Sequence, residues 1–377
     1  MWTFSIMMFA VMVIMGLSTG LTPFFSRQST PFGVGIPEEY QKDSFIIKRK
    51  KSFTTINVIL SIMMGLPLLA APFYPDESAA EIIFSIYLTI VIFVFIIISF
   101  LLQLKYRKEI LAWKKTLPLS DKKTKIVIDT TYHDTLDVVS NRTLLISQLV
   151  IIGFTVAITL YFYERIPQQI PVHWDINWNV DRYAEKNLLS VLALPFIQII
   201  MVPVLNVAHY SFIKSKQKLS PNKPVVSKEK SQLFRKAWSI YFFITAVLTQ
   251  LLLTVVQFFS VLDLKLNPSW MMVVIVIYLV ITMVSVFYLI LKYGQAGEKL
   301  KLANDEEEAV SYYADPDDDK AWKLGVFYYS KEDPAVFVEK RFGIGSTMNL
   351  ARWQAWLLVA ALILFILLSL AVSLLMI

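Results

Sequence analysis

The 377-residue sequence contains no cysteine, and eight of its long segments contain no Asp, Glu, Lys or Arg. The absence of cysteine excludes disulfide bonds, thiolate catalysis and cysteine-ligated metal or iron–sulfur sites. Histidine is scarce too, with three residues in the whole chain, whereas a zinc site needs several ligands placed together. We therefore predict neither a metal centre nor a cofactor.

Each of the eight uncharged segments is long enough to cross a bilayer as a helix, which takes about 20 apolar residues. The hydrocarbon interior offers no water to backbone groups, so helices are the expected solution. The sequence thus predicts an all-α polytopic membrane protein. The segments are Trp2–Phe25, Ser52–Tyr74, Ile82–Leu104, Thr143–Tyr163, Leu188–Ile213, Ala237–Leu262, Leu266–Leu291 and Trp353–Ile377.

Lys and Arg residues concentrate in alternate gaps between these segments. The gaps after the first, third, fifth and seventh segments hold six, nine, eight and nine of the 36 cations. Cations next to a span are retained in the cytoplasm, so we expect both termini outside. The first segment is interpreted as a retained span and not a signal peptide, because no basic leader or small-residue cleavage site accompanies it. The net charge of +7 then reflects this topology and an anionic inner leaflet, not nucleic acid.

The chain divides into three parts on this basis. Residues 1–291 form a seven-helix membrane region with an external loop at 164–187, residues 292–352 a cytoplasmic segment, and residues 353–377 the eighth helix. In the third gap, the basic amphipathic stretch Lys105–Leu117 predicts a helix on the inner membrane surface, and Lys125–Thr130 a short strand. Ser215–Ser231 reads as a flexible connector.

The cytoplasmic segment changes character along its length. Residues 304–319 are acidic, which predicts a mobile stretch repelled by anionic lipid. Trp322–Tyr329 and Ala335–Arg341 are aromatic and β-branched runs separated by a turn composition, which predicts a small hairpin over 322–349. Gly343 and Gly345 permit a tight bend before the last helix. Gly-Ile-Gly lacks the Lys-Ser/Thr and the βαβ context of a phosphate loop.

The external loop is the chemically densest part of the chain. It combines aromatic anchors with adaptable polar groups, as ligand-binding surfaces do; the same aromatics are also typical interfacial anchors. Oxygen-bearing side chains at every second position resemble a calcium loop, but Val180 stands where Gly is needed and Lys186 where a bidentate Glu belongs. The predicted recognition residues are His173, Trp174, Asp175, Asn177, Asp181, Arg182 and Tyr183.

The polar inventory of the spans argues against enzymatic and ion-coupled functions. His209 is the one ionisable side chain within them, and no nucleophile with a base or pair of carboxylates is visible. The amides in the spans are expected to form interhelical hydrogen bonds, and three prolines to kink their helices. A cavity near Pro195, Pro203, Asn206 and His209 would instead suggest a transporter or a lipid-handling protein. The amides are Asn57, Gln148, Gln198, Asn206, Gln250 and Gln257, and the prolines are Pro67, Pro195 and Pro203.

Two short patterns resemble known families. Ile170–Asp175 with Val180–Tyr183 resembles the signature of domain-of-unknown-function family 1648, found in bacterial multipass membrane proteins that include relatives of the immunity protein against the sporulation-delaying toxin. Trp322, Phe327–Tyr329, Asp333–Pro334, Phe337–Arg341, Gly343, Gly345 and Asn349 resemble domain-of-unknown-function family 5808, which often accompanies it. Trp178 departs from the first family, which usually has Gly there.

The resemblance implies a bacterial plasma-membrane protein that protects against, or senses, an envelope-active peptide or toxin, with signalling to a cytoplasmic regulator. In that case the external loop residues recognise the peptide. The cytoplasmic hairpin then offers a partner surface, and a scaffold that recruits a regulator through it is a third reading. The residues of that surface are Trp322, Tyr328, Tyr329, Lys340, Arg341, Gly343, Gly345 and Asn349.

Overall fold

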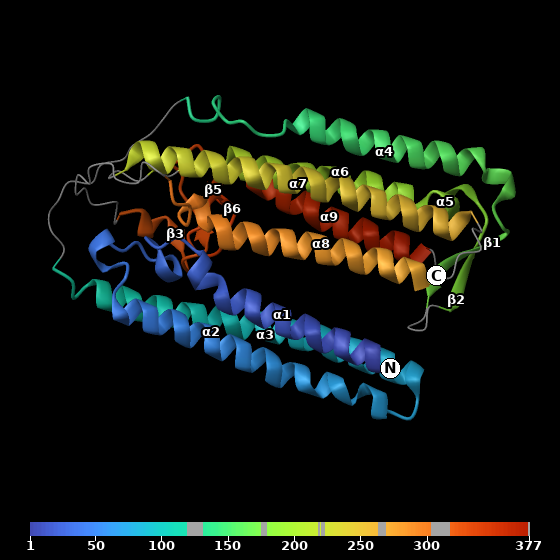
Figure 1. The fold of residues 1–377 in the computed structure, drawn as a ribbon, viewed down its shortest axis with the longest axis horizontal. Helices are drawn as coiled ribbons and strands as arrows, with labels where there is room; N and C mark the ends of the chain where they lie inside the picture. Colours follow the sequence, from blue (N-terminus) through green and yellow to red (C-terminus); the bar gives the residue numbers. More distant parts are fainter. Residues whose placement is uncertain are drawn as a thin grey trace.

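The computed structural model describes residues 1–118, 131–174, 179–217, 219, 223–262, 269–302 and 317–375. This part of the chain is mostly helical, and the long helices run along the longest axis of the molecule (Figure 1). A single-turn helix, α5 (Leu188–Val191), precedes α6. The long helices are α1 (Trp2–Phe25), α2 (Ser44–Gly65), α3 (Glu77–Lys114), α4 (Asn141–Tyr161), α6 (Ala193–Lys214), α7 (Pro224–Val261), α8 (Ser269–Tyr293) and α9 (Trp353–Leu375).

Within the described residues, seven helices are long and apolar enough to cross a bilayer. The prediction of a mostly helical multipass membrane protein in contact with lipid is confirmed in this form. The eighth predicted span corresponds to α9, whose stretch Trp353–Leu368 is a shorter apolar helix. The count of eight, and the side of the membrane on which each terminus lies, stay predictions.

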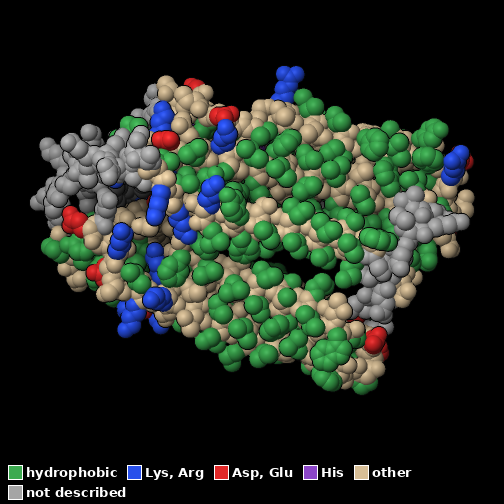
Figure 2. All heavy atoms as spheres, in the orientation of Figure 1, with side chains coloured by type: hydrophobic (Ala, Val, Ile, Leu, Met, Phe, Trp, Pro, Cys, Tyr) green, Lys and Arg blue, Asp and Glu red, His purple; other side chains and the backbone are tan. Residues whose placement is uncertain are grey.

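The two ends of the helices differ in character. Strands β1 (Gln169–Trp174) and β2 (Val180–Glu185) lie at one end, together with the N-terminus and the end of α9 (Figure 1). Most Lys and Arg side chains in view gather at the opposite end (Figure 2). We call these the hairpin end and the basic end. This arrangement agrees with the alternation of cations along the sequence, because every second gap between the long helices lies at the same end of the molecule.

The helices pack in two groups. In the first, α1 packs closely on α2, and α3 packs on both; Thr54 Oγ1 of α2 donates to the carbonyl of Gly20 in α1 at 2.7 Å. In the second, α4, α6 and α7 pack together, with α8 on α7 and α9 on α6. Figure 2 shows an opening between the groups towards the hairpin end. At the basic end, Arg27 in the loop after α1 pairs with Glu339.

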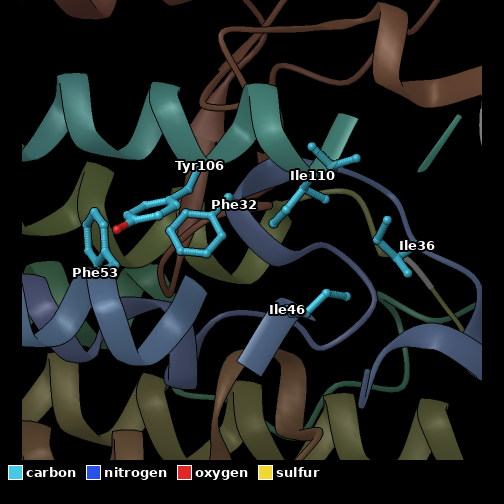
Figure 3. Packing of buried hydrophobic residues seen from close by; sticks show 7 residues of the cluster. Phe32, Ile36, Ile46, Phe53, Tyr106 and Ile110 are labelled. Carbon is cyan, nitrogen blue, oxygen red and sulfur yellow. The ribbon is translucent and has the colours of Figure 1, made fainter. Parts of the chain in front are cut away.

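The basic continuation of α3 corrects one prediction. Lys105–Lys114 continues α3 instead of forming a separate helix on the membrane surface. Its apolar face is covered by the loop after α1, since Tyr106 and Ile110 are buried with Phe32 and Ile36 (Figure 3). An internal partner therefore replaces the lipid surface that the amphipathic pattern indicated.

The predicted connector Ser215–Ser231 is also partly helical. Helix α7 begins at Pro224, a residue that fits the first turn of a helix because its missing N–H has no intrahelical acceptor there. Val226 and Ser231 are buried, which fixes this first part of α7 against the protein. The predicted strand Lys125–Thr130 lies outside the described residues, as do residues 304–316 of the acidic stretch.

Two small antiparallel hairpins precede α9, which confirms β-structure in this segment but corrects its pairing. Strand β3 (Trp322–Lys323) pairs with β4 (Phe327–Tyr328), and β5 (Phe337–Glu339) pairs with β6 (Ser346–Met348). The two predicted runs thus each pair locally and not with one another. The three-residue connection between β3 and β4 begins with Leu324 and Gly325, both with positive φ, and the Val326 N–H donates to the Lys323 carbonyl at 3.3 Å.

The predicted effects of the prolines differ from one another. At Pro67 the helix tightens into a 3₁₀ segment, Leu66–Phe73, which agrees with a local distortion. Pro203 lies inside α6. Pro195 is in the first turn of α6, where proline is tolerated, so this residue does not interrupt the middle of a span.

Candidate recognition hairpin

The predicted external loop folds as an antiparallel hairpin at the hairpin end. Ile170 pairs with Ala184, and His173 with Arg182, with register irregularities between Pro171 and Trp174. Sequence reasoning did not predict this pairing, although apolar residues at every second position, Ile170, Val172 and Trp174, are a strand signal.

The hairpin is attached to the membrane helices by a small apolar cluster. Ile166 and Ile170 pack with Val191 of α5 and Val261 of α7, and all four are buried. Strand β1 contacts α7, where the Trp174 ring lies 6.1 Å from that of Phe259. Trp174 therefore anchors the hairpin to the bundle instead of standing on its outer face.

Hydrogen bonds fix the return of the chain into α5. Lys186 Nζ donates to the carbonyl of Ile166 at 3.0 Å, and the Lys186 N–H donates to that of Gln168 at 2.8 Å. Asn187 and Ser190 form a capping box at the start of α5, which satisfies backbone donors of the first turn. The base of the hairpin is thus held on both sides.

The outer face of the hairpin is polar and exposed. His173 Nδ1 and Asp181 Oδ1 lie 2.6 Å apart, and their side chains are 48% and 45% exposed. This hydrogen bond lowers the pKa of Asp181, since it favours the charged carboxylate. Tyr183 is 53% exposed, and Arg182 is exposed on the same strand.

The structure thus brings His173 and Asp181 into contact, and it leaves Arg182 and Tyr183 exposed on the same hairpin. Asp175 and Asn177 lie outside the described residues. Groups of three or more His, Cys, Asp or Glu that could hold a metal ion are not found in the described part of the chain. Chemically, the exposed side chains of the hairpin offer a carboxylate, a guanidinium, an imidazole and a phenol, which suit hydrogen bonding and stacking with a peptide.

Half of the predicted partner surface at the basic end is buried, which corrects that assignment for four residues. Trp322, Tyr328, Arg341 and Asn349 are each less than 7% exposed. The Asn349 side chain accepts from the Ser330 N–H and donates to the Ser330 carbonyl, at 3.0 and 2.9 Å. These side chains hold the segment together instead of facing a partner.

The remaining residues of that prediction have separate roles. Gly343 and Gly345 adopt φ of 91° and 102°, as a tight bend requires, and the Gly345 N–H donates to Gln295 Oε1 at 2.8 Å. Lys340 is half-buried, and burial lowers its pKa. Tyr329 is exposed.

Buried ion pairs at the basic end were not predicted. Glu339 of β5 pairs with Arg235 of α7 at 2.9 Å and with Arg27 of the loop after α1. Asp319 pairs with Lys114 at 2.8 Å and with Arg341. Burial alone would raise the pKa of Asp319, but Arg341 and Lys114 hold it below its usual range. These pairs join the two helix groups, and no local sequence pattern indicates them because their partners are far apart in the chain.

Inside the second helix group, the predicted interhelical amide bonds are present. Gln250 of α7 donates to Gln148 Oε1 of α4 at 3.3 Å, and Gln198 Nε2 of α6 donates to the Gln250 carbonyl at 2.9 Å. His209 of α6 is fully buried and bonds Asn141 and Ser239 of the neighbouring helices. Asn206 Nδ2, in contrast, donates to the Val202 carbonyl of its own helix at 2.9 Å.

Two family comparisons match parts of the chain. Residues 150–199 match the domain of unknown function DUF1648, and residues 331–356 match the family of unknown function DUF5808. The first match covers the end of α4, the whole hairpin and the start of α6; the second begins after β4 and ends in α9. No curated protein and no solved structure matches the chain.

Proposed function

We propose that this chain is a non-enzymatic plasma-membrane protein that recognises a membrane-active peptide or toxin on the outer face of the β1–β2 hairpin, and so confers immunity or senses envelope stress. The observation that carries the proposal is a fixed hairpin with exposed His173, Asp181, Arg182 and Tyr183. A surface fixed before binding loses little conformational entropy on binding.

The position of the hairpin favours a ligand at the bilayer surface. Trp174 contacts α7 directly, and the buried cluster below it joins the ends of α5 and α7. A peptide that partitions into the interface therefore meets the polar face of the hairpin without leaving the membrane surface. The resemblance to a family with immunity-protein relatives points to protection as the outcome of binding.

The test is survival of a sensitive bacterial host exposed to a panel of membrane-active peptides. Asp181→Ala and Tyr183→Ala should each remove protection, because truncating a hot-spot residue weakens binding about 30-fold. Glu77→Ala is the matched control, since Glu77 is an exposed acid in the first turn of α3, which belongs to the other helix group. Membrane abundance should be equal in all strains. Full protection by both hairpin variants would exclude this role of the hairpin.

A second candidate function, recruitment of a cytoplasmic regulator, is favoured by one observation. Leu324, Phe327 and Tyr329 of the β3–β4 hairpin are 48%, 46% and 41% exposed, although these are apolar or aromatic side chains that suit a partner interface. Phe327→Ser should then abolish co-purification of a regulator while leaving peptide protection by direct binding intact. Co-purification that is unchanged in this variant would contradict the assignment.

A further inference from the structure

A groove of about 360 Å³ runs along the outer side of α7 and α8, which pack side by side (Figure 1). Of the seven spans, α8 is the least covered by the rest of the protein, so this groove opens towards lipid. Its walls are mainly aliphatic and aromatic side chains. They include Ile240, Ile244 and Leu248 of α7 and Ile281, Val284 and Tyr288 of α8.

Two of the polar side chains that line the groove form hydrogen bonds within the protein. Thr282 Oγ1 donates to the carbonyl of Tyr278 in its own helix at 2.9 Å, and Tyr241 Oη donates to the carbonyl of Thr282 at 3.4 Å. The wall therefore presents hydrocarbon to its occupant, which suits an acyl chain and disfavours a polar ligand.

The groove lies in the half of the membrane next to the basic end. Helix α7 leaves the basic end at Pro224 and α8 returns to it at Tyr293. From Ala237 to Leu248 the groove follows α7 for about 17 Å at 1.5 Å per residue, close to the depth of roughly 15 Å of one hydrocarbon leaflet. Its length thus matches one leaflet and does not cross the membrane.

Two lysines flank the groove where it meets the basic end. Lys236 precedes Ile240 by one helical turn, and Lys292 follows Tyr288 by one turn. Lys292 Nζ donates to Tyr288 Oη at 3.0 Å, a neutral partner, and Lys236 pairs with the exposed Asp137. We expect both lysine side chains to reach the headgroup level of the leaflet, because long cationic side chains extend towards it from the ends of spans.

We propose that the groove binds one acyl chain of an anionic phospholipid whose phosphate is held by Lys292 and Lys236. The two ends of the site match the two ends of such a lipid, with hydrocarbon below and negative charge at the mouth. Basic pockets between helices on the cytoplasmic side are favoured by anionic headgroups, and the positive-inside rule predicts that the basic end faces this side. The site is independent of peptide recognition at the hairpin end.

The experiment titrates the purified full chain with phosphatidylglycerol or phosphatidylcholine of identical acyl chains and counts retained lipid by native mass spectrometry. We expect one tightly retained phosphatidylglycerol. Lys292→Gln and Lys236→Gln should each weaken its retention about fivefold, and Ser285→Phe should displace the chain by filling the groove. Lys331→Gln is the matched control, because Lys331 is an exposed basic-end lysine outside the groove.

Equal retention of the two lipids by the unaltered chain would overturn the proposal, as would equal retention of phosphatidylglycerol by Lys292→Gln and Lys331→Gln. Circular dichroism and lipid-free thermal unfolding of each variant distinguish loss of binding from loss of fold. If Lys292→Gln misfolds, Lys292→Arg replaces it in the test, since it keeps the charge and should retain phosphatidylglycerol. A folded Lys292→Arg variant that no longer retains phosphatidylglycerol would also contradict a phosphate contact at this position.

Discussion

Replacement of Glu339 by Gln tests whether the buried ion pairs hold the two helix groups together. The Glu339 side chain is 7% exposed, and its partners Arg27 and Arg235 are 9% and 1% exposed. Removing one partner from a buried ion pair costs about 3–5 kcal/mol. Arg235 keeps carbonyl acceptors at the end of α6, so we expect the lower value, about 3 kcal/mol.

The absence of cysteine provides the assay. A single Ile36→Cys thiol is buried in the cluster formed by the loop after α1, so its reaction with a maleimide measures opening of the basic end. A loss of about 3 kcal/mol should raise that rate on the order of 100-fold. Glu332→Gln, an exposed acid in the same segment, should change it less than about threefold.

The result that would refute the reasoning is a labelling rate for Glu339→Gln within the range of the Glu332→Gln control. In that case the contacts among β5, α7 and the loop after α1 would be held by packing alone. A double-mutant cycle with Arg27→Met separates the pair from the surrounding contacts, because it measures the coupling between the two side chains.

Two further predictions concern the same end of the molecule. Gly33→Ala should lower the unfolding temperature strongly, since the added Cβ would lie 2.4 Å from the Gly325 carbonyl oxygen and the φ of Gly33 is +79°. Gly153→Ala is the control, because open space surrounds Gly153, and it should leave the unfolding temperature unchanged or slightly raised. Equal changes in unfolding temperature for the two variants would contradict the close approach of Gly33 to Gly325. The pKa values of Asp319 and Asp333 are lowered from 3.8, so their contribution to stability is present above about pH 4 and is lost as pH falls through the folded-state values. Asp333→Asn should make the fall in unfolding temperature between about pH 4 and 2 less steep. A pH profile identical to that of the unaltered chain would show that Asp333 does not contribute to this fall.

The membrane helices could be predicted because the bilayer imposes a length on uncharged segments, whereas their extensions could not. The extension of α3 past Leu104 and the early start of α7 at Pro224 depend on tertiary contacts. Ile110 is buried against the loop after α1, and Arg235 bonds carbonyls at the end of α6. A pattern of charge and hydrophobicity shows an amphipathic face but does not show what covers it.

The pairing of the short strands depends on backbone conformations that composition does not reveal. Leu324 has a φ of 54°, which is unusual for a residue other than Gly, Asn or Asp, so a local turn between β3 and β4 was not expected. The run Ser330–Pro334 has the composition of a hairpin turn but is held by Asn349 instead. These turn-forming residues therefore form a bend that Asn349 stabilises, and not a hairpin turn between the two predicted runs.

The candidate hairpin was singled out by its chemical density, and the two ends of the molecule differ in how this density relates to exposure. Asp181, Arg182 and Tyr183 of β2 are exposed, while β1 contacts α7, so composition and exposure agree at this end. At the basic end, aromatic and basic residues are equally dense, yet Trp322 and Arg341 are buried, with the guanidinium 5.5 Å from the ring centroid. The same residue types therefore build a surface at one end and a core at the other. The pairs Arg27–Glu339 and Arg235–Glu339 account for the difference: they bring distant segments over the basic residues, while nothing comparable in the described residues covers β2.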